Sequence, residues 1–205
     1  MYRNGRIYDE IDKTIIDIYL DYNIHSFPIN ETEICNKLAV ALVPYSAFSN
    51  DSKSLLCKKS KQGFFVKESR NHPPTIYYND AIGSFGSIRF TIFHELKHYI
   101  YNDPDDSDDD LADHFSRHFM CPTAYIMMKG LNSPNEIISY CGMSLNAACQ
   151  AYSGIANRIR KYGQNLFDYE IPLIEHLDPV LLETRKYKII QKEGDIPENK
   201  NIDKN

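Results

Sequence analysis

The sequence lacks the features that mark exported, membrane-spanning or disulfide-stabilised proteins. It has five cysteines, an odd number, and none of them forms a Cys-x-x-Cys pair. We interpret them as reduced packing residues. No apolar run approaches the roughly 18 residues of a membrane span, and no hydrophobic signal region follows the first residues. We therefore expect a cytoplasmic protein that has no membrane partner.

The chain also has no excess of positive charge. Its net charge of −5 argues weakly against nucleic acid as the main partner. A length of 205 residues and a hydrophobic content of 42% are enough for one domain with a substantial core. From residue 191 onward the sequence is charged and poor in apolar residues, so we expect residues 191–205 to form a disordered tail.

One motif carries most of the functional information. Residues 94–98 read His-Glu-x-x-His inside a stretch that is otherwise typical of a helix. Because residues four apart lie one above the other on a helix, His94 and His98 can offer two imidazoles to one zinc ion. Glu95 then lies beside the metal, where it can take a proton from a water molecule. Apolar residues occupy the opposite half of the same helix. The pattern favours a zinc metallopeptidase.

A third ligand has to come from elsewhere, because a catalytic zinc site usually has three protein ligands. The acidic run 103–110 leads into a second segment with helical periodicity. Asp109 lies on the same face of that helix as Ala112 and Ser116, whereas Asp110 and Asp113 project at the margin of this face. We therefore predict Asp109 as the third metal ligand.

The second helix contains a rival histidine pair. His114 and His118 are also four residues apart, so they too could bind a metal ion. They lie away from the face that carries Asp109, and no glutamate follows His114. We interpret them as a surface histidine pair.

These two helical segments resemble one known family. Ile88–Tyr99 is similar to the active-site helix of ImmA/IrrE-type zinc metallopeptidases. Ala112–Pro122 is similar to that family's stretch Glu-x-x-Ala-Asn-x-Phe-Ala-x-x-Leu-Leu-Met-Pro. Alignment of the alanine, the phenylalanine and the final proline places the family's ligand glutamate at Asp109, which is one methylene shorter. Lys97 stands where the family usually has glycine, and we interpret it as a surface change.

The resemblance extends upstream and spans roughly residues 15–162. Pro74–Asn79 is similar to the strand before the family's active-site helix. Ile29–Leu38 and Val43–Ser46 resemble its N-terminal helix and strand.

The resemblance implies a function. The protein would be a zinc-dependent endopeptidase of bacteria or their mobile elements, and its protein partner would be a cognate DNA-binding repressor, which it cleaves. A different class of function stays open, in which the chain is a non-catalytic zinc-binding regulator that acts by binding a protein or DNA. A purely structural zinc is a third reading, but it leaves Glu95 without a role.

The expected fold is α+β. We predict a small three-stranded sheet from residues 39–45, 64–67 and 75–79, packed on the His-Glu-x-x-His helix in the zincin manner. The last of these strands is either an edge of the sheet or a buried strand. Residues 46–62 are polar, and we expect a loop there. A mainly helical C-terminal part follows.

The sequence divides into four regions. Residues 1–130 form the expected metallopeptidase domain, in which helices are predicted at 8–22 and after Asn30. Residues 131–163 form a helical extension with helix starts at Ser133 and Ser144. The extension resembles a helix-turn-helix, which would direct Arg158, Arg160 and Lys161 at phosphates, but plain packing is the favoured reading. Residues 164–190 have no predicted structure, and the tail 191–205 follows.

Overall fold

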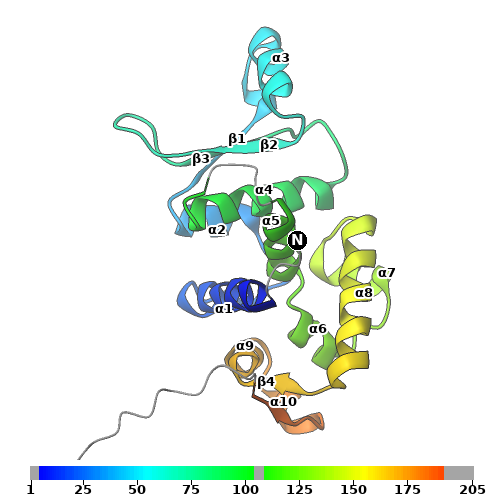
Figure 1. Cartoon of the computed structure of the whole chain (residues 1–205). Coiled ribbons are helices and arrows are strands. Elements are labelled where there is room, and N and C mark those ends of the chain that lie inside the picture. The colour runs from blue at the N-terminus through cyan, green and yellow to red at the C-terminus, as the bar shows by residue number, and fades with distance from the viewer. Residues whose placement is uncertain (1–4, 104–108, 192–205) are drawn as a thin grey trace, which may run out of the picture.

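A three-stranded mixed sheet lies at one end of the molecule, and helices make up most of the rest (Figure 1). The computed structural model describes residues 5–103 and 109–191. The structure therefore confirms an α+β architecture with a mainly helical C-terminal half. In the described residues, no helix combines the length and the apolar content needed to cross a membrane.

The sheet consists of β1 (Ala41–Pro44), β2 (Gly63–Val66) and β3 (Thr75–Tyr78), in the order β1-β3-β2. β1 runs parallel to β3, whereas β2 runs antiparallel to it. All three strands agree with the sequence prediction. β3 is the central strand, with Ile76 fully buried, so β2 and not β3 is available as an edge strand on this side of the sheet.

The polar region 46–62 is not a loop, as the sequence predicted, but largely a helix. After the short 3-10 helix η1 (Tyr45–Ala47), α3 spans Asn50–Lys59. Ser49 caps its first turn by accepting a hydrogen bond from the Ser52 N–H, and Lys58 and Lys59 lie near the negative end of the helix dipole. α3 buries no residue, so it has no apolar stripe by which the sequence could show it.

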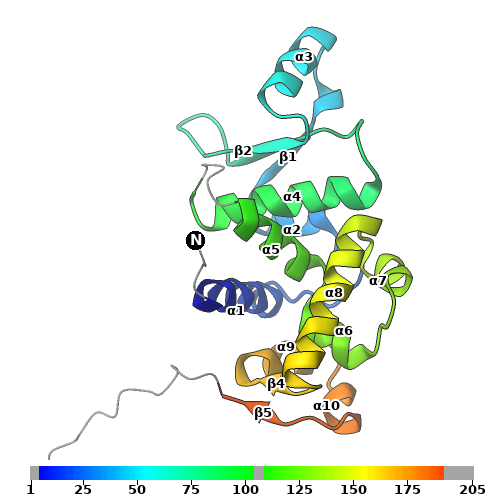
Figure 2. The same cartoon turned by 45° about the vertical axis from the view of Figure 1, so that its right-hand side comes forward.

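Three helices surround the main core. α1 (Gly5–Asp21) and α5 (Asp109–Met120) pack against each other, and α4 (Phe85–Ile100) lies between α5 and the sheet (Figures 1 and 2). The Phe93 and Phe119 rings have centroids 4.9 Å apart at the contact of α4 with α5. The Tyr19 hydroxyl donates to the Phe119 carbonyl oxygen over 2.6 Å, which ties α1 to the same place. α2 (Glu31–Lys37) begins at Asn30, whose side chain accepts from the Glu33 N–H as predicted.

The C-terminal half packs on this core through further helices. These are α6 (Thr123–Lys129), α7 (Pro134–Cys141), α8 (Leu145–Tyr162), α9 (Ile171–Leu177) and α10 (Val180–Thr184). Ser133 and Ser144 cap α7 and α8 as predicted. The close approach of α4 to the α7–α8 junction requires glycine at position 86, since a Cβ atom there would overlap the Ser144 backbone nitrogen.

The region 164–190 has a defined structure although its sequence predicted none. It contains β4 (Leu166–Phe167) and β5 (Ile189–Ile190), which pair in parallel, the 3-10 helix η3 (Asp168–Glu170), and the helices α9 and α10. Figure 2 shows this part at the end farthest from the three-stranded sheet. Of the tail predicted at 191–205, residues 192–205 lie outside the described residues.

The Arg158 side chain packs within this C-terminal region. It does not face solvent, as a side chain that binds DNA phosphates would. Its guanidinium donates to the Asn165 carbonyl oxygen over 3.0 Å and forms an ion pair with Glu170. Only 9% of its side chain is exposed. Arg160 and Lys161 are exposed, so the predicted set of three cations is reduced to two.

A buried arginine joins the sheet-side helices to the C-terminal half. The Arg89 side chain of α4 is 1% exposed and pairs with Glu31 of α2 over 2.9 Å. It also donates to the carbonyl oxygens of Cys141 and Gly142, at 2.9 and 2.8 Å, and to that of Ile29. One charged side chain therefore satisfies four acceptors from two segments far apart in the sequence, which a buried guanidinium needs in order to be stable.

We expect Arg89→Met to lower the free energy of unfolding by about 3–5 kcal/mol, because it leaves the Glu31 carboxylate and buried carbonyl groups without their donor. Urea denaturation followed by circular dichroism measures this change. Arg160→Met, which removes the same charge from an exposed position of α8, is the matched control and should have little effect. Equal losses in the two variants would contradict the structural role of Arg89.

Candidate metal centre

The structure brings the three predicted metal ligands together. His94 and His98 project from α4, and Asp109 begins α5. One ligand atom from each lies within 4.8 Å of the others, and His94 Nε2 is 3.7 Å from Asp109 Oδ1. Ligand atoms around a tetrahedral zinc ion lie about 3.3 Å apart when the bonds are about 2.0–2.1 Å long. Small side-chain adjustments are thus enough for joint coordination.

Both histidines are oriented by oxygen acceptors. His94 Nδ1 lies 2.9 Å from Asp113 Oδ1, and His98 Nδ1 lies 2.7 Å from the Asp103 carbonyl oxygen. Carbonyl and ionised carboxylate oxygens only accept hydrogen bonds, so Nδ1 is the protonated nitrogen in each ring. The Nε2 lone pairs are then directed away from these partners and are available to a metal ion.

His98 gives the most direct evidence that a cation fits this site. Its side chain is 3% exposed, and its Nε2 is buried and has no hydrogen-bond partner among the described residues. A buried polar atom without a partner carries a free-energy cost of about 1–3 kcal/mol. Because the proton on Nδ1 leaves Nε2 as an acceptor, a metal ion fits this position, and the donor set of two imidazoles and one carboxylate suits zinc.

Lys97 is buried and is not the surface change that the sequence suggested. It is 1% exposed, and its Nζ lies 2.6 Å from Asp103 Oδ2. The other oxygen of the Asp103 carboxylate lies 3.2 Å from His98 Nδ1. Lys97 thus holds the residue that orients His98. Sequence reasoning missed this role of Asp103, and its position at the end of the His-Glu-x-x-His helix is the only signal that could have shown it.

The electrostatics of the centre favour positive charge at His94. Burial alone would lower the pKa of His94, but the carboxylates of Asp113, Glu95 and Asp109 outweigh burial and raise the pKa above its usual value. Metal binding to this ring therefore displaces a proton at mildly acidic pH. The same carboxylates would stabilise a divalent cation.

Glu95 shares a cavity of about 360 Å³ with His94, Asp109 and Asp113. It is half-buried and lies close enough to affect the pKa of His94 and that of Tyr45. Burial, Cys57 and Glu95 together raise the pKa of Tyr45 to about 12. The Tyr45 hydroxyl donates to the carbonyl oxygen of Ser60, which also lines the cavity, so its proton is already used in this hydrogen bond.

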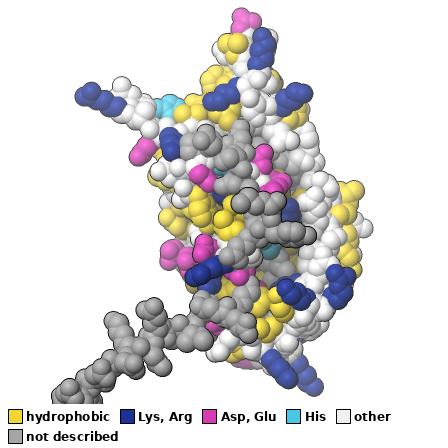
Figure 3. Space-filling model, in the orientation of Figure 1, with side chains coloured by type: hydrophobic (Ala, Val, Ile, Leu, Met, Phe, Trp, Pro, Cys, Tyr) yellow, Lys and Arg dark blue, Asp and Glu magenta, His cyan; other side chains and the backbone are white. Residues whose placement is uncertain are grey.

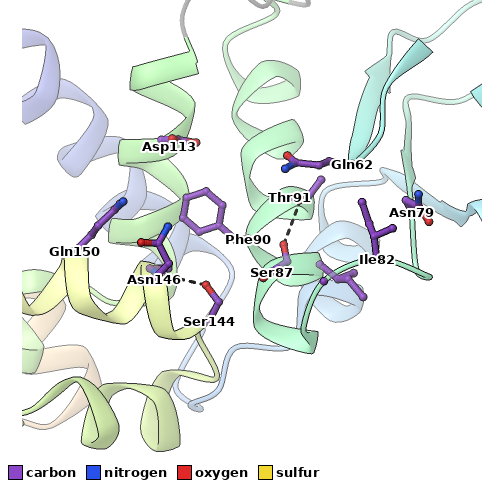
Figure 4. Close-up of a pocket in the computed structure, with 13 residues that line it drawn as sticks. Gln62, Asn79, Ile82, Ser87, Phe90, Thr91, Asp113, Ser144, Asn146 and Gln150 are labelled. Atoms are coloured by element: carbon purple, nitrogen blue, oxygen red, sulfur yellow. Dashed lines mark hydrogen bonds between the residues drawn. The ribbon is translucent and has the colours of Figure 1, made fainter. Parts of the chain in front are cut away.

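A second cavity of about 380 Å³ continues from the first, and the two share Gln62, Phe90, Thr91 and Asp113. Figure 4 shows that its lining comes from both sides of α4, with Gln62 and Asn79 on the sheet side and Asn146 and Gln150 on α8. The candidate metal centre therefore lies in a longer cleft. Such a cleft has room for several residues of an extended peptide.

Three carboxylates, those of Glu95, Asp109 and Asp113, line the cavity of the candidate centre. Figure 3 shows acidic side chains in several groups on this face, and most lysines and arginines lie toward its rim. This distribution agrees with the acidic first turn of α5. It favours cationic ligands near the centre.

The rival pair His114 and His118 is not a plain surface pair. Their side chains are only 14% and 23% exposed, and both contact Asp12 of α1. The structure thus contains a second His/Asp cluster on the far side of α5 from Asp109. The sequence alone could not show it, because Asp12 lies far upstream.

Comparison with known proteins adds no independent assignment. No family model matches the chain, and no curated protein matches its sequence. The functional conclusion therefore depends on the motifs and on the geometry described above.

We expect Asp113→Ala to weaken zinc binding about tenfold or more, because loss of the acceptor frees the His94 ring to rotate. Competition with a chromophoric chelator measures the affinity. Asp110→Ala removes the same charge from the same turn of α5 and is the matched control. Equal losses of zinc affinity in the two variants would mean that Asp113 acts through its charge and not by orienting His94.

Proposed function

We propose that this protein is a zinc-dependent endopeptidase of the ImmA/IrrE type. His94, His98 and Asp109 hold the metal, and Glu95 is the general base. The observation that carries the proposal is the convergence of these three side chains, together with a buried His98 Nε2 that has no partner in the part of the chain that the structure describes. Glu95 lines one cavity with His94 and Asp109. The resemblance of the two helical motifs to that family supports the same conclusion.

The residues present divide the chemistry between them. A zinc ion held here would polarise the scissile carbonyl group and lower the pKa of a water molecule. The Glu95 carboxylate takes a proton from the attacking water and later delivers it to the nitrogen of the leaving amine. Asp113 and Asp103 keep the two imidazoles in the orientation that the site requires. Asp109 reaches the site although it is shorter than glutamate, since α5 begins close to His94.

The edge strand β2 supports an extended peptide as the substrate. Gly63, its first residue, lines the cavity beside Glu95, and no strand of the described residues pairs with the outer side of β2. The Asn79 N–H donates to the Gln62 carbonyl oxygen, so the antiparallel alternation directs the backbone groups of Gly63 and Phe65 to the open side. The Gly63 N–H already donates to the Ser60 hydroxyl oxygen over 3.2 Å, so the groups offered to a substrate strand are the Gly63 carbonyl oxygen and the Phe65 backbone. A substrate strand can add there by backbone hydrogen bonds.

The charge of the protein supports a basic partner. The net charge is −5, and three carboxylates line the cavity of the candidate centre. A cognate DNA-binding repressor, the substrate that the resemblance implies, carries basic segments that such a surface attracts. The non-catalytic alternative, a regulator that binds DNA through α7 and α8, is less well supported because Arg158 is used in packing.

Glu95→Gln should reduce the rate of repressor cleavage by about 10²–10⁴-fold, because the amide cannot accept the proton from water. The rate is measured by incubating the zinc-loaded protein with a candidate repressor, and zinc content is measured on the same samples. Zinc content should not change, since Glu95 is not a ligand.

Glu175→Gln, an exposed position on α9, is the matched control and should cleave at the parental rate. Cleavage by the Glu95 variant at that same rate would contradict the catalytic assignment. Zinc binding by the parent protein without cleavage of the repressor or of a random peptide library would favour the non-catalytic regulator.

A further inference from the structure

A second cluster of metal-ligating side chains joins α5 to α1. It consists of Asp12, His114 and His118, which we call the Asp12 cluster. Asp12 Oδ1 is 2.9 Å from His114 Nε2 and 2.9 Å from His118 Nδ1. The two imidazole rings have centroids 3.8 Å apart and planes inclined by 32°. Three ligand atoms from two helices therefore converge within 4.8 Å.

The protonation states of the cluster suit metal binding. Burial opposes ionisation of Asp12, but the two imidazoles outweigh it and hold the pKa of Asp12 well below its usual range. Burial and the neighbouring His118 lower the pKa of His114. Asp12 is thus a carboxylate at neutral pH, and His114 is a neutral imidazole. Asp12 Oδ1 accepts from His114 Nε2–H, so a metal ion binds by replacing that proton, and the neutral His114 ring then carries its proton on Nδ1.

The surroundings leave room for a fourth ligand. A cavity of about 30 Å³ adjoins Asp12 and His118 and is also lined by Tyr169 and Glu170. A cavity of this size holds one water molecule. Glu170 is paired with Arg158, so it is not needed as a ligand. Between 14% and 24% of each side chain in the cluster is exposed, which allows an ion to enter from solvent.

We propose that Asp12, His114 and His118 form a second metal site, which takes a divalent transition-metal ion of the zinc class and fastens α5 to α1. Two imidazoles and one carboxylate are a donor set typical of such ions, and their spacing is close to that of ligands around one ion. The first turn of α5 carries Asp109, so the second ion steadies the helix that presents the third ligand of the candidate catalytic centre.

The Asp12 cluster has no glutamate in the position of Glu95, so the proposal gives it a structural role and not a catalytic one. It is independent of the proposed peptidase activity. Either site can exist without the other, and variants of each can be measured separately.

Metal stoichiometry tests the proposal directly. The chelator-treated protein is reloaded with Zn²⁺, dialysed, and analysed by inductively coupled plasma mass spectrometry. We expect two ions per chain in the parent, one in His118→Gln, one in His94→Ala, and none in the double variant. Glutamine at 118 can still hydrogen-bond to Asp12, so loss of the ion would not merely report misfolding. His176→Ala, outside both clusters, is the matched control and should retain two ions.

Thermal unfolding gives a second readout that does not depend on activity. In the His94→Ala background, Zn²⁺ should raise Tm, and this rise should disappear when His118→Gln is added. The proposal would be overturned if the parent bound one ion per chain, if His94→Ala lost that ion, and if His118→Gln kept it. The Asp12 cluster would then be a hydrogen-bonded group of two histidines on one carboxylate. Failure of the peptidase assay alone would leave these outcomes unchanged.

Discussion

The apolar contact between α4 and α5 is the constraint on which the candidate centre depends. Phe93 of α4 and Phe115 and Phe119 of α5 are fully buried and pack together. This contact sets the distance between the two helices and therefore the distance between His94 and Asp109. Because protein interiors are close-packed and resist deformation, a metal centre built across such a contact is held in place before any ion arrives. The polar side chains could not hold this spacing by themselves, because converging ligand atoms repel one another or compete for protons.

Around the two histidines, the protein uses ionised side chains to orient the imidazole rings. Asp113 lies across α5 from the apolar contact and accepts from His94, while Lys97 holds Asp103 beside His98. Burial of a lysine is costly unless it is paired, so the Lys97–Asp103 pair defines one arrangement of this corner. Arg89 acts in a similar way about two turns earlier on α4, where it joins α2 to the α7–α8 junction. α4 is therefore fixed at both ends by buried ion pairs, and the two histidines of the candidate centre lie toward the second of them.

α5 presents different chemistry on its two polar sides. Asp109 and Asp113 face α4, and His114 and His118 face α1, with the buried aromatic residues between them. A helix that carries ligands on two sides can couple the stability of α1 to the geometry of the candidate centre. The packing of α1 on α5, including the hydrogen bond from Tyr19 to Phe119, is the route for that coupling.

The local features of the fold could be predicted from the residues alone. Strand-forming residues predicted β1, β2 and β3, the cap residues Asn30, Ser133 and Ser144 marked helix starts, and the spacing of His94, His98 and Asp109 placed them on suitable helix faces. These features depend on neighbours within a few residues, which periodicity and capping report directly. Only the tertiary structure decided that β3 is central, that Lys97 and Arg158 are buried with partners, and that α3 forms without an apolar stripe. It alone joined Asp12 to His114, which lies 102 residues later. The physical reason is that burial and ion pairing are set by which distant segments pack together, and a single sequence carries no local pattern for that choice.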